Sequence, residues 1–281
     1  MSHDAWRAAR WILWAGTLGF GSSLLDRAQA ALSAGFEAFS LSPIDVRDAD
    51  ASGWSAADIG KWAADQGLAL VMDPVVGWHP YENAWPFRYA EIGLDDTLRM
   101  CRELRCRSMT AVAMTDCTIP VTELAGPFRA LCRRVAADGI DVHLEFIPMT
   151  VVPDLRVAWD IVGDADEDNG GLLVDSWHFF RGDPDFDLLG TVPANRIFAV
   201  QVNDADPVVR GSLWDDTRHR KLPGDGSFDL VRLLSTITGT GGPRWVGPEV
   251  FSADLAAMPA SEAAHLAGER VRALVDAVRS R

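Results

Sequence analysis

The segment that decides the fold runs from residue 109 to residue 146 and combines MTAVAM (109–114), TELAGPFRALCRRVAA (122–137), a glycine (139) and DVHLEF (141–146). The first and last runs are short and apolar, which is typical of strands covered on both faces. The middle run has the apolar period of a helix, and the glycine is a helix stop. The segment therefore predicts the strand–helix–strand unit of a parallel sheet.

The same alternation runs through all 281 residues. Eight apolar runs are predicted strands: Ile12–Gly16, Ala38–Leu41, Ala69–Met72, Met109–Met114, Asp141–Phe146, Gly171–Val174, Ile197–Val202 and Trp245–Phe251. The helices with the clearest start or stop signals are Leu24–Ser33 after Ser22 or Ser23, Ala56–Asp65 after Ser55, Thr122–Ala137 before Gly139, and a final helix that follows Ser261 and runs to about Val278. Eight such units predict an α/β fold, a single (β/α)8 TIM barrel, for which about 250 residues is typical.

The competing architecture is an open, doubly wound sheet. It would place a glycine-rich phosphate turn of the order GxGxxG after the first strand. The turn at residues 16–21 reads GTLGFG, which lacks that order. No linker rich in Pro, Gly or Ser divides the chain, so we expect one domain over residues 1–281, with residues 1–10 as an N-terminal extension.

Composition and charge exclude several classes of protein. The chain has 26 Lys+Arg and 40 Asp+Glu, and the net charge of −14 repels phosphate backbones, so we expect no nucleic-acid partner. No apolar run approaches the roughly 20 residues of a membrane helix, and Met1–Trp14 is too broken for a signal peptide. We therefore expect a cytoplasmic protein with no membrane partner; a homodimer stays open. The four cysteines lack CxxC spacing, which indicates reduced thiols.

Oxygen-bearing side chains end four consecutive predicted strands: Glu145, Asp175, Gln201 and Glu249. TIM-barrel active sites lie at these strand ends. A carboxylate in an apolar run is unfavourable unless it is paired or bound to a cation, and one divalent ion would also relieve the repulsion between carboxylates. The alternative is four separate loop residues with ordinary partners. Such hard ligands favour Mn2+ or Mg2+ over Co2+ or Zn2+, whereas a histidine at position 201 would favour Zn2+.

Four motifs carry a family resemblance: LLVDSWH (172–178), VQVND (200–204), RKLPGDG (220–226) and GPEV (247–250). From about Trp11 onward the chain resembles the sugar phosphate isomerase/epimerase family, within the xylose-isomerase-like TIM barrel superfamily. The resemblance implies that the four strand-end residues are metal ligands. It also implies that His178 supports the ligands or binds substrate, and that Arg220 contacts a polar or anionic group of the substrate.

Two branches of the superfamily match less well. Endonuclease IV needs a histidine-rich cluster of three metals, whereas this chain has Gln201 and ends its fourth strand with Ala-Met-Thr (113–115). Dehydroshikimate dehydratases commonly carry a histidine two residues after the strand-5 glutamate, where this chain has Ile147.

The predicted site permits proton transfer at carbon. A metal can polarise the ketone of a hydroxy-ketone or polyol-derived substrate. Glu145 and Glu249 could then remove and return a proton through an enediolate, which gives isomerisation or epimerisation. If a β-hydroxyl leaves instead, with His178 protonating it, the enzyme is a dehydratase. A barrel that binds a small polyol without turnover is the non-enzymatic alternative, and the complete set of four ligands argues against it.

Three further side chains are candidate substrate contacts because they fall near the predicted strand ends: His79, Trp177 and Trp214. The long segment 205–226 is a candidate lid, since loops of this length in compact domains are usually functional. A solvated, charged loop is the alternative.

Overall fold

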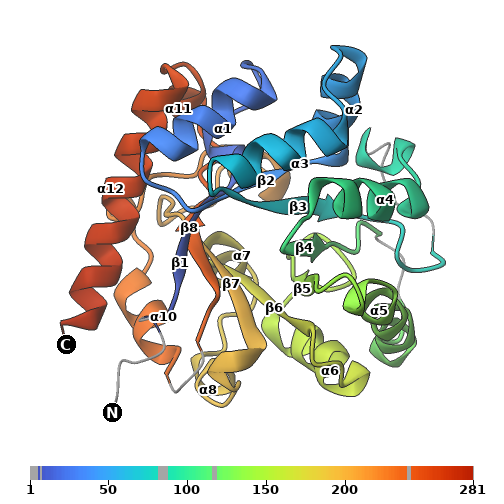
Figure 1. Ribbon diagram of the computed structural model, residues 1–281. Helices are drawn as coiled ribbons and strands as arrows, with labels where there is room; N and C mark the ends of the chain where they lie inside the picture. The colour runs from blue at the N-terminus through green and yellow to red at the C-terminus, as the bar shows by residue number, and fades with distance from the viewer. Residues whose placement is uncertain (1–5, 7, 82–87, 116–118, 239–241, 281) are drawn as a thin grey trace. The chain divides into compact units, whose positions relative to one another are not determined.

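The computed structural model describes residues 6, 8–81, 88–115, 119–238 and 242–280. Its strands form a closed barrel in the order β1 to β8, which confirms the predicted (β/α)8 fold (Figure 1). The strands are β1 Arg10–Leu13, β2 Ala38–Leu41, β3 Ala69–Val75, β4 Ser108–Ala111, β5 Asp141–Glu145, β6 Gly170–Asp175, β7 Ile197–Val202 and β8 Trp245–Pro248.

Helices follow the strands along the chain. The α-helices are α1 Leu24–Ser33, α2 Pro43–Ala51, α3 Ala56–Asp65, α4 Leu94–Leu104, α5 Val121–Ala136, α6 Leu155–Ala165, α7 Ser176–Arg181, α8 Phe186–Leu189, α9 Leu213–Asp216, α10 Leu230–Thr236, α11 Ala253–Ala256 and α12 Ala260–Arg279. Short 3-10 helices cover Ala15–Leu18, Arg88–Glu91 and Ala194–Arg196.

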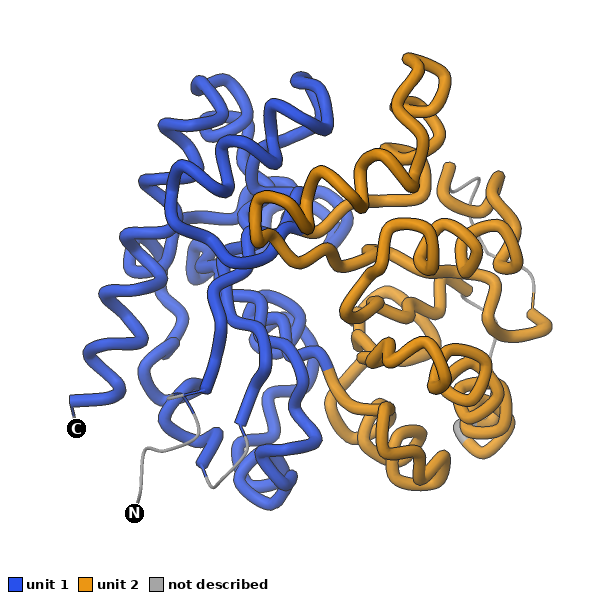
Figure 2. Tube along the Cα trace, viewed as in Figure 1, with its two compact units in different colours: residues 1–39, 173–281 blue, residues 40–172 orange. Residues whose placement is uncertain are grey.

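The chain divides into two compact units (Figure 2). The first unit comprises residues 1–39 and 173–281, and the second comprises residues 40–172. One domain over residues 1–281 stays a prediction. Within the predicted N-terminal extension, Trp6 is buried and its Nε1 donates a hydrogen bond to the carbonyl of Leu234 at 3.1 Å.

In the first unit, β8 pairs in parallel with both β7 and β1. A Cβ added to Gly247 would lie 1.6 Å from the carbonyl oxygen of Ile12, so this pairing requires glycine there. The end of β8 is held by Thr17. Its Oγ1 donates to the carbonyl of Pro248 at 2.9 Å and accepts from the N–H of Val250 at 3.1 Å. These two bonds fix the chain on both sides of Glu249.

Several predicted boundaries are confirmed to the residue. The strands Ala38–Leu41 and Ile197–Val202 match, and so do the helices Leu24–Ser33 and Ala56–Asp65. The side chains of Ser23 and Ser55 accept hydrogen bonds from the backbone N–H groups of Asp26 and Asp58, as N-caps do.

Other boundaries were wrong, and proline or local helix explains most of them. The predicted strand Trp245–Phe251 ends at Pro248, which has no N–H to continue the ladder. The predicted strand Ile12–Gly16 ends at Leu13 because Ala15–Leu18 forms a 3-10 helix. The final helix begins at Ala260 after Pro259, so that Ser261 lies inside it.

The described cysteines are buried and form no disulfide with one another: Cys101, Cys106 and Cys132. A hydrogen bond with Cys101, together with burial, raises the pKa of the Cys106 thiol, which keeps it protonated. Cys117 lies outside the described residues. Among the helices in the described ranges, none is both long and apolar enough to cross a membrane.

Candidate functional site

Asp175 is both the last residue of β6 and the N-cap of α7. Its Oδ1 accepts a hydrogen bond from the backbone N–H of His178 at 2.9 Å, the contact that defines an N-cap. The strand therefore passes directly into a helix at this residue. This local geometry holds a fully buried carboxylate at the C-terminal end of the strand.

The other oxygen of Asp175 joins a buried ionic network. Asp175 Oδ2 accepts from Arg220 Nη1 and from Asn203 Nδ2, each at 2.9 Å. Arg220 Nη1 also lies 3.2 Å from Glu249 Oε2 and 3.2 Å from the Glu249 carbonyl. The side chains of Arg220, Asp175 and Glu249 are 1%, 0% and 9% exposed. One guanidinium nitrogen thus links the carboxylate that ends β6 with the carboxylate that follows β8.

Arg220 is itself enclosed by aromatic and polar groups. Its guanidinium carbon lies 5.4 Å from the ring centre of Trp177 and 4.8 Å from that of Phe251. Its Nη2 donates to Thr217 Oγ1 at 3.2 Å and lies 3.5 Å from His178 Nε2. The structure therefore brings His178 and Arg220 together with Asp175 and Glu249.

Gln201 lies on β7, the strand between β6 and β8 in the barrel order. Its side chain is fully buried. Neither its amide oxygen nor its amide nitrogen has a hydrogen-bond partner among the residues that the structure describes. Buried polar groups are nearly always hydrogen-bonded or bound to an ion, so this amide fits the role of a ligand to a cation.

Asn203 was not recognised as a site residue from the sequence. It is buried two residues beyond Gln201, and its Nδ2 donates both to Asp175 Oδ2 and, at 3.1 Å, to the Glu249 carbonyl. Ser176 Oγ donates to the Asn203 carbonyl at 2.7 Å. Because side chains alternate along a strand, the two-residue spacing from Gln201 was the signal that could have identified Asn203.

Asp216 was missed as well, since this last residue of α9 lies among other charged residues and no local pattern distinguishes it. It is buried, and its Oδ2 accepts from Trp177 Nε1 at 3.0 Å and from Arg181 Nε at 2.8 Å. Its Oδ1 accepts from the N–H of Arg210 at 2.7 Å. Asp216 thus anchors the middle of the segment 205–226. A lid function for this segment stays a prediction.

Asp204 holds the turn that begins at Arg220. Its Oδ1 accepts from the N–H of Phe228 at 3.0 Å, and its Oδ2 accepts from the N–H of Gly224 at 3.1 Å. A Cβ on Gly226 would lie 2.2 Å from Asp204 Oδ1, so the close approach requires glycine. The turn is therefore fixed next to the end of β7, and Arg220 is fixed with it.

The two candidate tryptophans of the first unit differ in exposure. Trp177 is fully buried, and its Nε1–H donates a hydrogen bond to Asp216. Trp214 lies on α9 and is 36% exposed. Contact of either ring with a substrate stays a prediction.

Glu145 and His79 belong to the second unit. Glu145 ends β5, His79 follows β3, and each is 6% exposed. The His79 ring packs edge-on against Trp78, whose Nε1 donates to the carbonyl of Val112 at 3.0 Å. Burial lowers the pKa of His79 below its ordinary 6.5, and the backbone of Tyr81 offsets part of this effect. His79 is therefore a neutral imidazole at pH 7.

His79 should make the protein less stable in acid. Below about pH 6.5 the unfolded chain binds a proton that folded His79 resists, so the free energy of unfolding falls as the pH decreases. Urea unfolding of the wild type and of His79→Gln at about pH 7.5 and 5.5 measures this effect. The variant should lose less stability on acidification. The exposed His265→Gln control should behave like the wild type, and equal losses in all three proteins would contradict the prediction.

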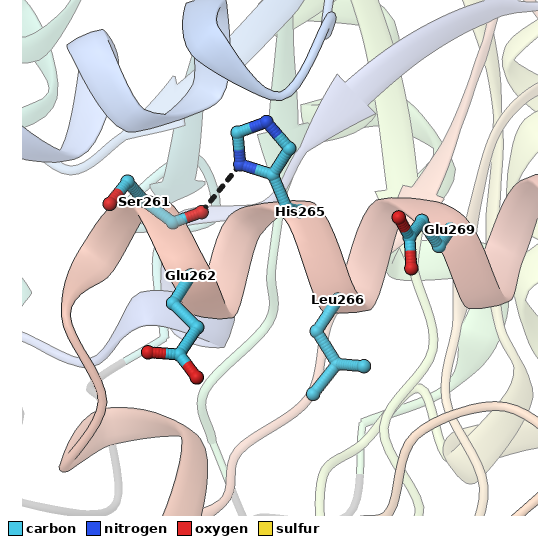
Figure 3. A pocket seen from close by; sticks show the side chains of 5 residues that line it. All are labelled: Ser261, Glu262, His265, Leu266 and Glu269. Atoms are coloured by element: carbon cyan, nitrogen blue, oxygen red, sulfur yellow. Dashed lines mark hydrogen bonds between the residues drawn. The ribbon is translucent and has the colours of Figure 1, made fainter.

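A shallow hollow on α12 is separate from the strand ends. It is lined by Ser261, Glu262, His265, Leu266 and Glu269 (Figure 3). The Nδ1 of His265 lies 2.7 Å from the carbonyl of Ser261, one turn earlier on the same helix. None of the strand-end residues lines this hollow, so we do not assign the site to it.

The fold and the strand-end residues define a class of protein. The chain belongs to the xylose isomerase-like TIM barrel family, whose model matches residues 28–276. This confirms the superfamily predicted from the sequence motifs.

The chain is also similar to individual enzymes and to a solved structure. A 3-dehydroshikimate dehydratase of Pseudomonas aeruginosa is 27% identical over 256 residues, 86% of this chain and 38% of that protein. An inosose isomerase of Bacillus velezensis is 31% identical over 139 residues, 49% of each protein. The match thus spans less than half of either relative. The solved structure of an IOLI protein with a bound zinc atom superimposes with a TM-score of 0.83 at 20% identity, covering 97% of this chain and all of that one.

Proposed function

We propose that the protein is a divalent-metal-dependent isomerase or epimerase that acts on a hydroxy-ketone related to a sugar or polyol. One observation carries the proposal. Three successive strands have the buried oxygen donors Asp175, Gln201 and Glu249 at or next to their C-terminal ends, and the Gln201 amide has no hydrogen-bond partner within the described part of the chain. The likeness to inosose isomerase supports the reaction class.

Glu145, Asp175, Gln201 and Glu249 would hold the ion. All four are buried and carry hard oxygen donors, which favours Mn2+ or Mg2+. His178 is a further buried donor next to Asp175, and its imidazole would favour Zn2+ or Co2+. The zinc atom named for the IOLI structure supports a divalent ion in this fold.

The chain's own residues would position the substrate and move its protons. When bound, the ion would polarise the ketone oxygen and so acidify the neighbouring C–H group. Glu145 and Glu249 would remove and return the proton. His178 would donate a proton to a substrate oxygen, and Arg220 would bind a polar group of the substrate. His79, Trp177 and Trp214 would contact the substrate, and the burial of the carboxylates would limit the access of water.

Metal analysis tests the proposal. The purified wild type should contain about one divalent ion per chain, and Glu145→Gln should lose it because a charged ligand is removed. The exposed Glu262→Gln is the matched control and should keep the ion. A wild type that holds no ion, and whose melting temperature does not change when Mn2+ is added, would overturn the metal-dependent function.

A dehydratase is the second candidate, supported by the match to 3-dehydroshikimate dehydratase over 86% of this chain. Ile147 argues against dehydroshikimate itself as the substrate. Incubation with keto-sugars and keto-inositols in D2O separates the two reactions. Deuterium entering a substrate that keeps its oxygens indicates an isomerase or epimerase, and loss of water indicates a dehydratase.

A further inference from the structure

Two carboxylate oxygens converge on one nitrogen of Arg220. Nη1 lies 2.9 Å from Asp175 Oδ2 and 3.2 Å from Glu249 Oε2, and all three side chains are buried. Asp175 and Glu249 are also two of the proposed ligands, so this inference rests on the proposed function. One cationic nitrogen therefore already contacts two of the oxygens that would hold the ion.

We infer that Arg220 is a built-in cation that competes with the divalent ion for Asp175 Oδ2 and Glu249 Oε2. Buried carboxylates need a positive partner, and Arg220 supplies one before an ion binds. Two cations held by the same pair of oxygens in a buried site repel each other strongly. Arg220 Nη1 therefore leaves both oxygens when the ion binds.

The surroundings of Arg220 allow such a movement. The rings of Trp177 and Phe251 lie within 5.4 Å and 4.8 Å of the guanidinium carbon, so the group can shift while keeping cation–π contacts. Nη2 already donates to Thr217 Oγ1 at 3.2 Å, which gives the guanidinium a second anchor. The released Nη1 can then donate to a substrate oxygen, so that ion binding creates the contact expected of Arg220.

The opposite role is that Arg220 orients the two carboxylates and strengthens ion binding. Changes to groups around metal ligands typically weaken metal affinity by about 10- to 100-fold. Competition predicts a change of similar size with the opposite sign. The sign of the affinity change therefore separates the two roles.

Calorimetric titration with Mn2+ measures that sign. Arg220→Met should bind Mn2+ at least about tenfold more tightly than the wild type, with Arg220→Lys in between because it keeps a positive charge. Arg272→Met removes the same charge at a site that does not contact Asp175 or Glu249, and its affinity should stay within about twofold of the wild type. Equal or weaker binding by Arg220→Met overturns the inference. If neither the wild type nor Arg220→Met binds Mn2+, the proposed metal site itself is wrong.

A second measurement covers the case in which Arg220→Met does not fold. The Nε–H signal of Arg220 in a 15N NMR spectrum can be assigned as the signal that Arg220→Lys loses. Addition of Mg2+ to the wild type should shift this signal as Nη1 leaves the carboxylates. An unshifted signal, with Mg2+ binding established by a raised melting temperature, overturns the inference.

Discussion

Asp175→Asn is expected to bind Mn2+ at least about 100-fold more weakly than the wild type, since it removes a charged ligand rather than a neighbour of one. The variant also takes one of two carboxylate partners from the buried Arg220. Breaking a buried pair usually lowers the free energy of unfolding by 3–5 kcal/mol. Because Glu249 still pairs with Arg220, we expect a loss of about 3 kcal/mol or less.

The helix cap makes this experiment interpretable. Asparagine caps helices as well as aspartate does, so α7 should still begin at Ser176 and the circular dichroism spectrum should not change. Asp154→Asn changes another N-cap, that of α6, and should keep both the cap and the ion affinity. Calorimetry and urea unfolding measure the two effects. Binding of Mn2+ by Asp175→Asn within about threefold of the wild type would remove Asp175 from the ligand set.

Gln201→Met is expected to stabilise the protein and to weaken ion binding. The buried Gln201 amide has no hydrogen-bond partner among the described residues, and such a group reduces stability by about 1–3 kcal/mol. Methionine has a similar shape and no amide, so the free energy of unfolding without metal should rise by about that amount. Its soft thioether is a poor ligand for Mn2+ or Mg2+, so the affinity for either ion should fall at least about tenfold.

An exposed glutamine supplies the control for this second prediction. Gln66 is the exposed C-cap of α3, and Gln66→Met should change stability by no more than about 0.5 kcal/mol and leave ion affinity unchanged. Unfolding by urea in EDTA, followed by titration with Mn2+, provides both values. A Gln201→Met protein less stable than the wild type would mean that the amide has a stabilising partner, and the argument for a ligand would fail.

Helix boundaries and polar residues within apolar runs could be predicted because both depend on neighbouring residues in the sequence. The helix Ala56–Asp65 was predicted to the residue because its N-cap, Ser55, directly precedes it. Asp175, Gln201 and Glu249 were selected because polar groups are conspicuous in apolar runs, and the structure places all three in buried positions at strand ends. Their binding of a metal stays a prediction.

Contacts between distant residues could not be predicted in this way. Arg220 is 45 residues from Asp175, and nothing local to Arg220 indicates which carboxylates it will meet. Asp216 is similar, since it lies among charged residues that are mostly exposed, and only the folded chain shows that it accepts from Trp177 and Arg181. Prolines were the other source of error, because Pro248 ends β8 and Pro259 moves the start of α12.

Asp175 and Gln201 differ in how many structural roles constrain the residue type at each position. Asp175 must serve a strand, a helix cap and an ion pair at once, so glutamate lacks the right reach and asparagine lacks the charge. The Gln201 amide makes no hydrogen bond with any other described group. In the proposed metal site, a single substitution at position 201, for example to histidine for Zn2+, would therefore change the metal preference and leave the barrel the same.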